Sequence, residues 1–328
     1  MVIYPDKLKK GDEVRIIAPS TSFSVISEEQ KEIAINRLES IGLKVSFGKN
    51  IHESDIYTSS SIDSRVEDLH DAFKDKNVKA ILTVLGGLNA NQMLDYIDFD
   101  LIKNNPKIFC GYSDITALQN AILAKTGLVT YSGPHFASFG MKKGFDHTLD
   151  YFKKSFLQNK PFEIEDSKEW SNDKWFLDQE NRHFYKNEGT KVFQEGKAKG
   201  TIIGGNLCTL NLLQGTKYMP KFKDVILFLE DVEMMEGYSG EFDRNLQSLI
   251  HSEDFSQVKA LVIGRAMKDT DFSLEKLSHT VNSKKELKNI PVLYDADFGH
   301  TYPIVTFPIG GEVSIDTYKQ NKIEILKH

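Results

Sequence analysis

One serine, Ser113, lies where an apolar strand gives way directly to a helix. The strand is predicted over residues 107–110, and a helical pattern of apolar residues begins at residue 117. A serine at such a corner has its hydroxyl lifted into solvent, with the backbone N–H of the next residue, Asp114, beside it. That is the geometry of a nucleophile. Serine and aspartate are also common helix N-caps, so the same residues could serve only to begin the helix.

A nucleophilic serine needs a base, and the base needs a group that orients it. His300 is the favoured base, because it stands in the turn Gly-His-Thr-Tyr-Pro after a predicted strand at 292–295. His135, which follows Gly-Pro, is the competing histidine. Glu230 is the favoured orienting acid, because it closes the apolar run 225–229, where a carboxylate is costly unless it is paired. The alternative is a strand-terminal acid that faces water.

The tetrahedral intermediate of acyl transfer carries an oxyanion that needs two fixed hydrogen-bond donors. The backbone N–H of Asp114 is one candidate. Gly87 is the second, because it follows the apolar strand predicted at 78–85 and its missing side chain lets the backbone approach a substrate. An ordinary strand-to-helix turn at Gly86-Gly87 fits the same pattern.

The elements that must position these residues alternate between strand and helix in the first half of the chain. Strands are predicted at 14–18, 44–47, 78–85, 107–110 and 128–131, and helices at 27–42, 64–74, 89–97 and from 117 onward. This alternation predicts an α/β domain over residues 1–160, with an open, mostly parallel sheet and flanking helices. Ligands bind such sheets at the carboxyl ends of the strands, where Gly87 and Ser113 lie.

The second half has a different character. Residues 161–194 form a polar, aperiodic stretch that contains both tryptophans, Trp170 and Trp175, and is predicted to be a linker or recognition loop. Aromatic residues in a polar loop either bind a ligand or pin the loop to the body of the protein. Residues 195–328 are predicted to form a smaller, barrel-like α/β domain that carries Glu230 and His300. Its last strands are expected at 292–295, 305–307, 312–315 and 322–326.

Composition excludes several classes of protein. The 328 residues carry a net charge of −6, which argues against a nucleic-acid-binding surface. No apolar run approaches the roughly 18–20 residues of a membrane span. The N-terminal residues lack the apolar region of a signal peptide, so a cytoplasmic protein is expected. The nine histidines and two cysteines show no metal-binding spacing, and neither a metal nor another cofactor is expected.

Six segments together resemble the serine LD-carboxypeptidase family. They are APS at 18–20, LGGLNANQML at 85–94, GYSDIT at 111–116, GGNLCTL at 204–210, VILFLED at 225–231 and FGHTYPIVTFPIG at 298–310. The resemblance runs in order over essentially the whole chain. It implies an N-terminal α/β domain, a swivelling barrel-like C-terminal domain and a homodimer.

The resemblance also implies roles for the residues named above. The family's serine, glutamate and histidine map onto Ser113, Glu230 and His300, and its oxyanion donors map onto Gly87 and Asp114. Gly111 precedes the serine, but Ile115 stands where the G-x-S-x-G elbow has its second glycine. The α/β-hydrolase fold is therefore not expected.

Two branches of that family cleave different substrates. One removes the terminal D-alanine from murein tetrapeptides, and its members tend to carry Arg-Gly-Gly-Tyr-Gly where this chain has Leu-Gly-Gly-Leu-Asn at 85–89. The other, the microcin C self-immunity peptidase, cleaves the amide between an aminoacyl group and a modified nucleotide. Asn89 and the tryptophan-bearing loop make this chain more similar to the second branch. In that branch a loop tryptophan stacks on adenine, which makes Trp175, or else Trp170, a candidate substrate contact together with Asn89.

These observations predict a serine peptidase or amidase that acts on a microcin C-like peptidyl- or aminoacyl-nucleotide. The first alternative is an LD-carboxypeptidase that acts on murein tetrapeptide. The second, from another class, is a non-catalytic nucleotide-binding protein. In each case the expected partner is a small molecule, and neither a nucleic acid nor a membrane.

Overall fold

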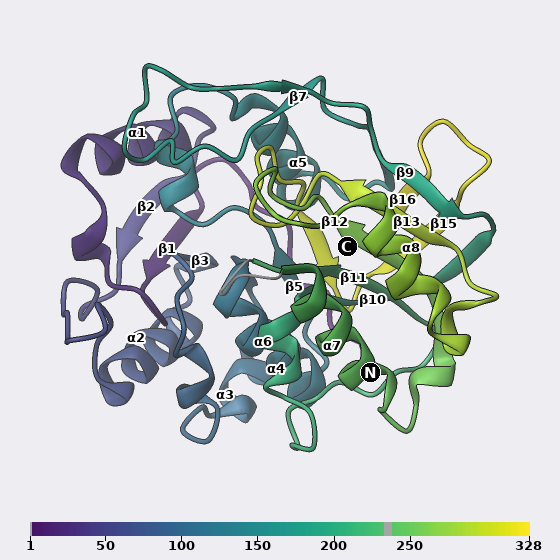
Figure 1. The fold of residues 1–328 in the computed structure, drawn as a ribbon. Coiled ribbons are helices and arrows are strands. Elements are labelled where there is room, and N and C mark those ends of the chain that lie inside the picture. The colour runs from purple at the N-terminus through teal and green to yellow at the C-terminus, as the bar shows by residue number, and fades with distance from the viewer. Residues whose placement is uncertain (1, 233–237) are drawn as a thin grey trace.

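The computed structural model of the chain describes residues 2–232 and 238–328. Two sheets lie side by side, one built mainly from each half of the chain, with helices around them (Figure 1). The chain has a mixed α/β fold, as predicted. No helix within the described ranges combines the length and the apolar character that crossing a membrane requires.

The first sheet is mostly parallel. In spatial order its strands are β14 (Phe307–Ile309), β5 (Thr130–Ser132), β4 (Ile108–Gly111), β3 (Val78–Thr83), β1 (Glu13–Ile17) and β2 (Lys44–Phe47). Every neighbouring pair from β5 to β2 is parallel, because a helix or a longer excursion returns the chain between strands. The helices of this half are α1 (Glu28–Ser40), α2 (Ile62–Lys74), α3 (Phe99–Asn104), α4 (Thr116–Thr126) and α5 (Asp146–Leu157).

Two predicted elements, one strand and one helix, differ from the structure. The strand expected at 305–307 in the second half forms instead at Phe307–Ile309, and as β14 it pairs antiparallel with β5. There it covers the edge of the first sheet. The helix expected at 89–97 is only a short 3-10 turn over Ala90–Met93, because Asp98 caps a separate helix, α3, by accepting a hydrogen bond from a backbone N–H.

The second sheet is a curled sheet of mixed direction. In spatial order its strands are β6 (Phe162–Ile164), β16 (Ile323–Lys327), β15 (Glu312–Asp316), β10 (Lys197–Asn206), β11 (Val225–Glu230), β12 (Val258–Gly264), β13 (Val292–Ala296) and β9 (Lys191–Gln194). The central strands β10 to β13 are parallel, and the outer strands are antiparallel. Its helices are α6 (Leu207–Asn211), α7 (Tyr238–Ile250) and α8 (Leu274–Asn282).

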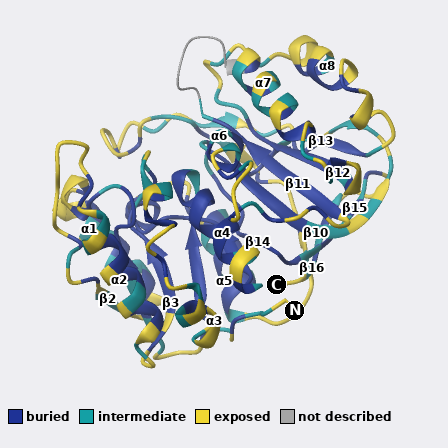
Figure 2. Ribbon diagram, turned by 90° about the horizontal axis from the view of Figure 1, so that it is seen from below, coloured by how far each residue is buried: buried dark blue, intermediate teal, exposed yellow. Residues whose placement is uncertain are grey.

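The central strands of both sheets are mostly buried, whereas the helices and the edge strand β2 carry exposed residues (Figure 2). All six residues of β11 are buried, so the strand lies within the core on both faces. The excursion between the halves adds a small ribbon, β7 (Glu169–Trp170) paired with β8 (Tyr185–Lys186). Parallel strands that end together in a packed core form a rigid edge on which side chains can be placed.

Gly204 in β10 gives a test of this packing. Its φ is +143°, and a Cβ there would lie 2.0 Å from the carbonyl oxygen of Phe228 in β11. We expect Gly204→Ala to lower the free energy of unfolding by about 2 kcal/mol or more, measured by urea denaturation. Gly240→Ala is the matched control, because a Cβ there meets nothing within 4 Å in helix α7. Equal midpoints for the two variants would contradict this account.

Candidate active site

Ser113 stands at a sharp corner between β4 and α4. Its φ is +60°, a left-handed conformation that is uncommon for any residue except glycine. A 3-10 turn over Ser113–Ile115 leads into α4, whose N-cap position is Ile115, with no side-chain capping bond. The chain can fold back this tightly because Gly111 has no side chain, and a Cβ there would lie 2.3 Å from the hydroxyl of Thr83. Ser113 is therefore not the side-chain cap of α4.

The predicted base and acid lie beside this serine. His300 Nε2 is 3.0 Å from Ser113 Oγ, and His300 Nδ1 is 2.7 Å from Glu230 Oε2. A carboxylate only accepts hydrogen bonds, so Nδ1 carries the proton and Nε2 is free to accept one from the serine hydroxyl. Gly299, with φ of +108°, makes this approach possible, because a Cβ there would lie 2.9 Å from Glu230 Oε2. The three residues thus form one hydrogen-bonded chain.

The surroundings of His300 raise the proton affinity of its imidazole. Burial of His300 lowers its pKa, but the charge of Glu230, the hydrogen bond to it and the charge of Asp231 raise it. The pKa of His300 lies above its ordinary value of 6.5 as a result. The buried carboxylate of Glu230 would therefore stabilise the imidazolium that forms when His300 takes up a proton.

Asn206 and Asp231 complete the surroundings of the acid. Asn206 ends β10 directly opposite Glu230 in the parallel register, and its Nδ2 donates to Glu230 Oε1 and to Asp231 Oδ1, each at 3.2 Å. Burial and the charge of Glu230 raise the pKa of Asp231 to about 7. Neither residue was predicted from the sequence to belong to the site. Their signal is positional, since each lies at the carboxyl end of a central parallel strand.

The Gly86-Gly87 pair lies against the nucleophile corner. A Cβ at Gly86 would lie 2.8 Å from the Cβ of Ser113 and 3.5 Å from the backbone nitrogen of Asp114. Gly87 has φ of +155°, and a Cβ there would lie 2.2 Å from the hydroxyl of Ser20. A side chain at either position would collide with these neighbours, so both glycines are required for the close approach. The roles of Gly87 and Asp114 as oxyanion donors stay predictions.

The carboxylate of Asp114 holds this arrangement together. It accepts hydrogen bonds from Ser20 Oγ at 2.6 Å and from the backbone N–H of Ala90 at 2.8 Å. Asp114 therefore ties the corner that carries Ser113 to the segment that follows Gly87. Ser20 is a further residue to which the sequence analysis assigned no role, although it lies in the APS segment.

A cavity of about 340 Å³ opens beside Gly87. No residue of its lining carries a charged side chain; the lining residues are Ser20, Thr21, Tyr57, Thr58, Ser59, Gly87, Leu88, Asn89 and Gln92. Asn89, the predicted substrate contact, belongs to this lining. Its side-chain oxygen accepts a hydrogen bond from the buried guanidinium of Arg65 at 3.2 Å. The cavity therefore offers hydrogen-bonding groups without an exposed charge.

The two tryptophans occupy different surroundings. Trp175 is 5% exposed, packs in the core of the first half, and meets the ring of Tyr302 edge-on at 6.3 Å. Trp170 is half-buried, lies 5.1 Å from the guanidinium of Arg265, and lines a second cavity of about 330 Å³ with Tyr185. Trp175 thus contacts Tyr302 through its ring, whereas Trp170 directly precedes Ser171, whose backbone pairs with that of Tyr302. Which tryptophan contacts a substrate stays a prediction.

His135, the competing base, is buried and hydrogen-bonds to Thr83. Its Nδ1 lies 2.9 Å from Thr83 Oγ1, and its ring stacks on Tyr112 at 4.2 Å. Burial, and then the charge of His300, lower the pKa of His135 to about 3, so this ring stays neutral. Of the two histidines, His300 is therefore the one placed to exchange a proton with Ser113.

Comparison with known proteins agrees with this architecture. Residues 14–133 match the LD-carboxypeptidase N-terminal domain, and residues 199–315 match the LD-carboxypeptidase C-terminal domain. YocD of Bacillus subtilis strain 168, whose name places it among carboxypeptidases, is 55% identical over 99% of this chain and 100% of its own. The microcin C7 self-immunity protein MccF of Escherichia coli is 30% identical over 96% of this chain and 93% of its own.

Solved structures extend the likeness to three dimensions. The crystal structure of an MccF-like protein from Bacillus anthracis strain Ames superimposes with a TM-score of 0.98 at 54% identity, over 100% of both chains. MccF in complex with aspartyl sulfamoyl adenosine superimposes with a TM-score of 0.88 at 30% identity, over 99% of both chains. With both domain matches in order and relatives aligned over their full lengths, this chain belongs to the LD-carboxypeptidase family, a family of hydrolases.

Proposed function

We propose that this protein is a serine amidase that cleaves the amide of a microcin C-like peptidyl- or aminoacyl-nucleotide, and so detoxifies it. The observation that carries the proposal is the hydrogen-bonded chain from Ser113 through His300 to the buried Glu230. The proposal includes a cytoplasmic location, a homodimer, and a division into an N-terminal domain at 1–160, a recognition loop at 161–194 and a C-terminal domain at 195–328.

The proposed reaction follows from the protonation states of the three side chains. His300 Nε2 takes the proton of Ser113 as Oγ attacks the amide carbonyl carbon, and the N–H groups of Gly87 and Asp114 bind the oxyanion. The C–N bond then breaks while the imidazolium of His300 donates its proton to the leaving nitrogen. Water, deprotonated by His300, then attacks the carbonyl carbon of the resulting ester. The bond between that carbon and Oγ breaks, His300 returns the proton to Oγ, and the acid is released. Glu230 keeps Nδ1 protonated throughout and stabilises the positive charge.

The choice of substrate rests on charge and on the relatives. A murein tetrapeptide ends in a free carboxylate, and a carboxylate taken out of water needs a cation or several donors to offset its desolvation. The cavity beside Gly87 has no charged lining residue, which favours an uncharged group there. The MccF structure with aspartyl sulfamoyl adenosine supports an aminoacyl-nucleotide.

Murein tetrapeptide cleavage remains the second candidate. The chain is 30% identical both to MccF and to a B. subtilis relative whose name refers to murein peptides, so identity does not separate the two activities. The non-catalytic alternative predicts nucleotide binding without turnover. The experiments below separate all three.

Ser113→Ala should lower kcat on aminoacyl sulfamoyl adenosine by about four orders of magnitude or more and leave substrate binding largely intact. The wild type should cleave this compound faster than murein tetrapeptide when product release is followed side by side. Ser40→Ala, on the exposed end of α1, is the control. Near-normal turnover by Ser113→Ala would exclude the mechanism, and cleavage of the tetrapeptide alone would exclude the proposed substrate.

The raised pKa of His300 predicts the acid side of the pH profile. The base must be neutral to accept a proton, so kcat/KM should fall as the pH drops through the pKa of His300, at a midpoint above 6.5. Glu230→Gln removes the charge that raises this pKa, so the midpoint should move to lower pH while the maximal rate falls. Glu253→Gln, an exposed acid outside the site, should change neither. A wild-type midpoint at or below 6.5 would refute the assignment.

The two tryptophans can be separated by paired conservative variants. Trp175→Phe keeps an aromatic ring in the core but reduces the stacking surface, so the KM for an adenosine-containing substrate should rise about threefold or more. Trp170→Phe should leave that KM nearly unchanged. The reverse pattern would assign the contact to Trp170, and no change in either variant would rule out stacking on a loop tryptophan.

A further inference from the structure

The segment at 297–302, which carries His300, belongs to no strand or helix and must be held by its neighbours. Both of its ends are anchored on one short stretch of the 161–194 segment. At the start, Asp297 Oδ2 accepts a hydrogen bond from the backbone N–H of Ser167 at 2.7 Å. At the end, Tyr302 and Ser171 exchange two backbone hydrogen bonds, each 2.7 Å long. The catalytic candidate His300 lies between these two anchors.

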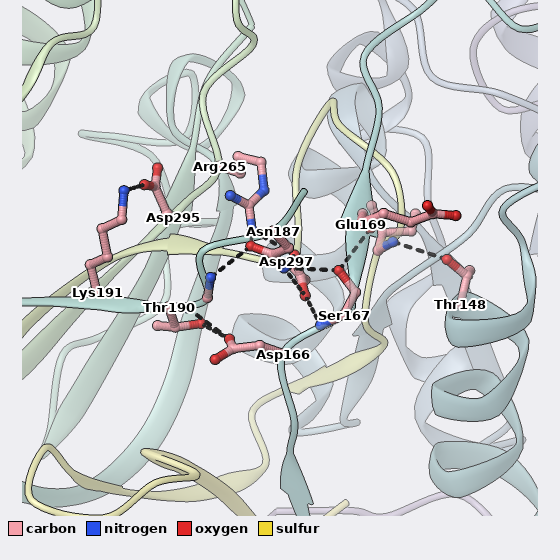
Figure 3. A network of polar contacts seen from close by, with 12 residues as sticks. Thr148, Asp166, Ser167, Glu169, Asn187, Thr190, Lys191, Arg265, Asp295 and Asp297 are labelled. Atoms are coloured by element: carbon pink, nitrogen blue, oxygen red, sulfur yellow. Dashed lines mark hydrogen bonds and ion pairs between the residues drawn. The ribbon is translucent and has the colours of Figure 1, made fainter. Parts of the chain in front are cut away.

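The anchor at Asp297 is a buried ionic network (Figure 3). Asp297 is 1% exposed and forms an ion pair with Arg265 at 2.8 Å. Asn187 donates to the same carboxylate and accepts from the guanidinium of Arg265 at 2.8 Å. A buried, hydrogen-bonded ion pair fixes geometry because removing either partner leaves a charge without compensation. This end of the segment is therefore rigid.

The anchor at Tyr302 reaches further, to the nucleophile itself. The hydroxyl of Tyr302 lies 3.0 Å from the hydroxyl of Tyr112, the residue that precedes Ser113. Within the described ranges, and apart from the Ser113–His300 contact, this is the hydrogen bond that joins the segment of His300 directly to the corner of Ser113. The ring of Tyr112 also meets the imidazole of His300 edge-on at 5.5 Å.

The hydroxyl of Tyr112 keeps its proton over the working pH range. Burial, followed by the neighbouring Tyr302, raises the pKa of Tyr112 well above its ordinary value of 10. A protonated phenol can both donate and accept, so one hydroxyl donates to the other at neutral pH. The link is thus available whenever the reaction proceeds.

We propose that Tyr302 is a positioning residue, which sets the distance between Ser113 and His300 by tying the segment of the base to the corner of the nucleophile. The inference rests on the proposed serine-hydrolase function. A displacement of about 1 Å between reacting groups can cost on the order of a hundredfold in rate. Tyr302 contacts His300 through the chain and through Tyr112, so its loss acts on geometry rather than on substrate binding.

Tyr302→Phe removes the hydroxyl and keeps the ring and the backbone pairing with Ser171. We expect kcat on aminoacyl sulfamoyl adenosine to fall about tenfold or more, with KM within about twofold of the wild type. Tyr112→Phe removes the same hydrogen bond from the other side and should have a similar effect. The double variant should be little worse than either single variant, because both changes delete one interaction.

Tyr151→Phe is the matched control. Tyr151 is a buried tyrosine whose hydroxyl also has hydrogen-bond partners, the carbonyl of Glu163 and the N–H of Glu165, but it has no role in the proposed site. Its loss should lower thermal stability and leave kcat unchanged. Normal kcat in Tyr302→Phe, or a fall in kcat equal to that of Tyr151→Phe, would overturn the positioning role.

The failure of this inference can be told apart from the failure of the proposed function. If the wild type is inactive, or if Ser113→Ala remains active, the serine mechanism is wrong and Tyr302 has no reaction to serve. If the wild type is active and Ser113→Ala is inactive, the response of kcat in Tyr302→Phe alone decides the positioning role. Strictly additive effects in the double variant would show that the two hydroxyls act separately and would also contradict the proposal.

Discussion

The contact between Ser113 and His300 spans the two sheets of the molecule, and the candidate site depends on it. Ser113 follows β4 of the first sheet, whereas His300 follows β13 of the second. Beyond His300 the chain crosses to the first sheet and forms β14 there. The backbone of Ile304 on this crossing donates to Thr148 Oγ1 in α5. His300 therefore lies on the connection between the two sheets. Any shift of one sheet against the other changes the distance between His300 Nε2 and Ser113 Oγ.

Buried charge is the second constraint. An isolated carboxylate in a core costs on the order of several kcal/mol, and Glu230 offsets this cost through His300 and Asn206. Asp231 lies beside it, and burial together with the charge of Glu230 raises the pKa of Asp231 to about 7. Glu230 and Asp231 thus share the side-chain amide of Asn206. Near neutral pH Asp231 takes up a proton in part of the molecules and does not add a full charge. This favours a single, well-defined negative charge behind the imidazole.

The local sequence pattern predicted the strands, helices and turns better than it predicted which residues contact one another. Ser113, Glu230 and His300 could be selected because each stands at a strand end or in a turn, and the alternation of strands and helices predicted the parallel first sheet. The contacts of Asn206, Tyr302 and Ser20 depend on strand register and on the crossing between sheets, which no local pattern encodes. The same limit explains why the strand expected at 305–307 was assigned to the C-terminal domain, whereas β14 pairs with β5 in the first sheet. The burial of Trp175 in the core of the first half also depends on tertiary packing, so the local sequence could not predict it.

The double anchoring of the 297–302 segment has a thermodynamic consequence. Ser167 and Ser171 hold both ends of the segment that carries His300, and they lie in the same 161–194 stretch as the two tryptophans. A compound that binds this stretch and stabilises its present conformation also stabilises the present position of the His300 imidazole, because ligand binding and the position of the segment are thermodynamically linked. A compound that binds but distorts the stretch would occupy the enzyme and be turned over slowly. Selectivity would then be expressed in the rate of the chemical step as well as in the tightness of the complex.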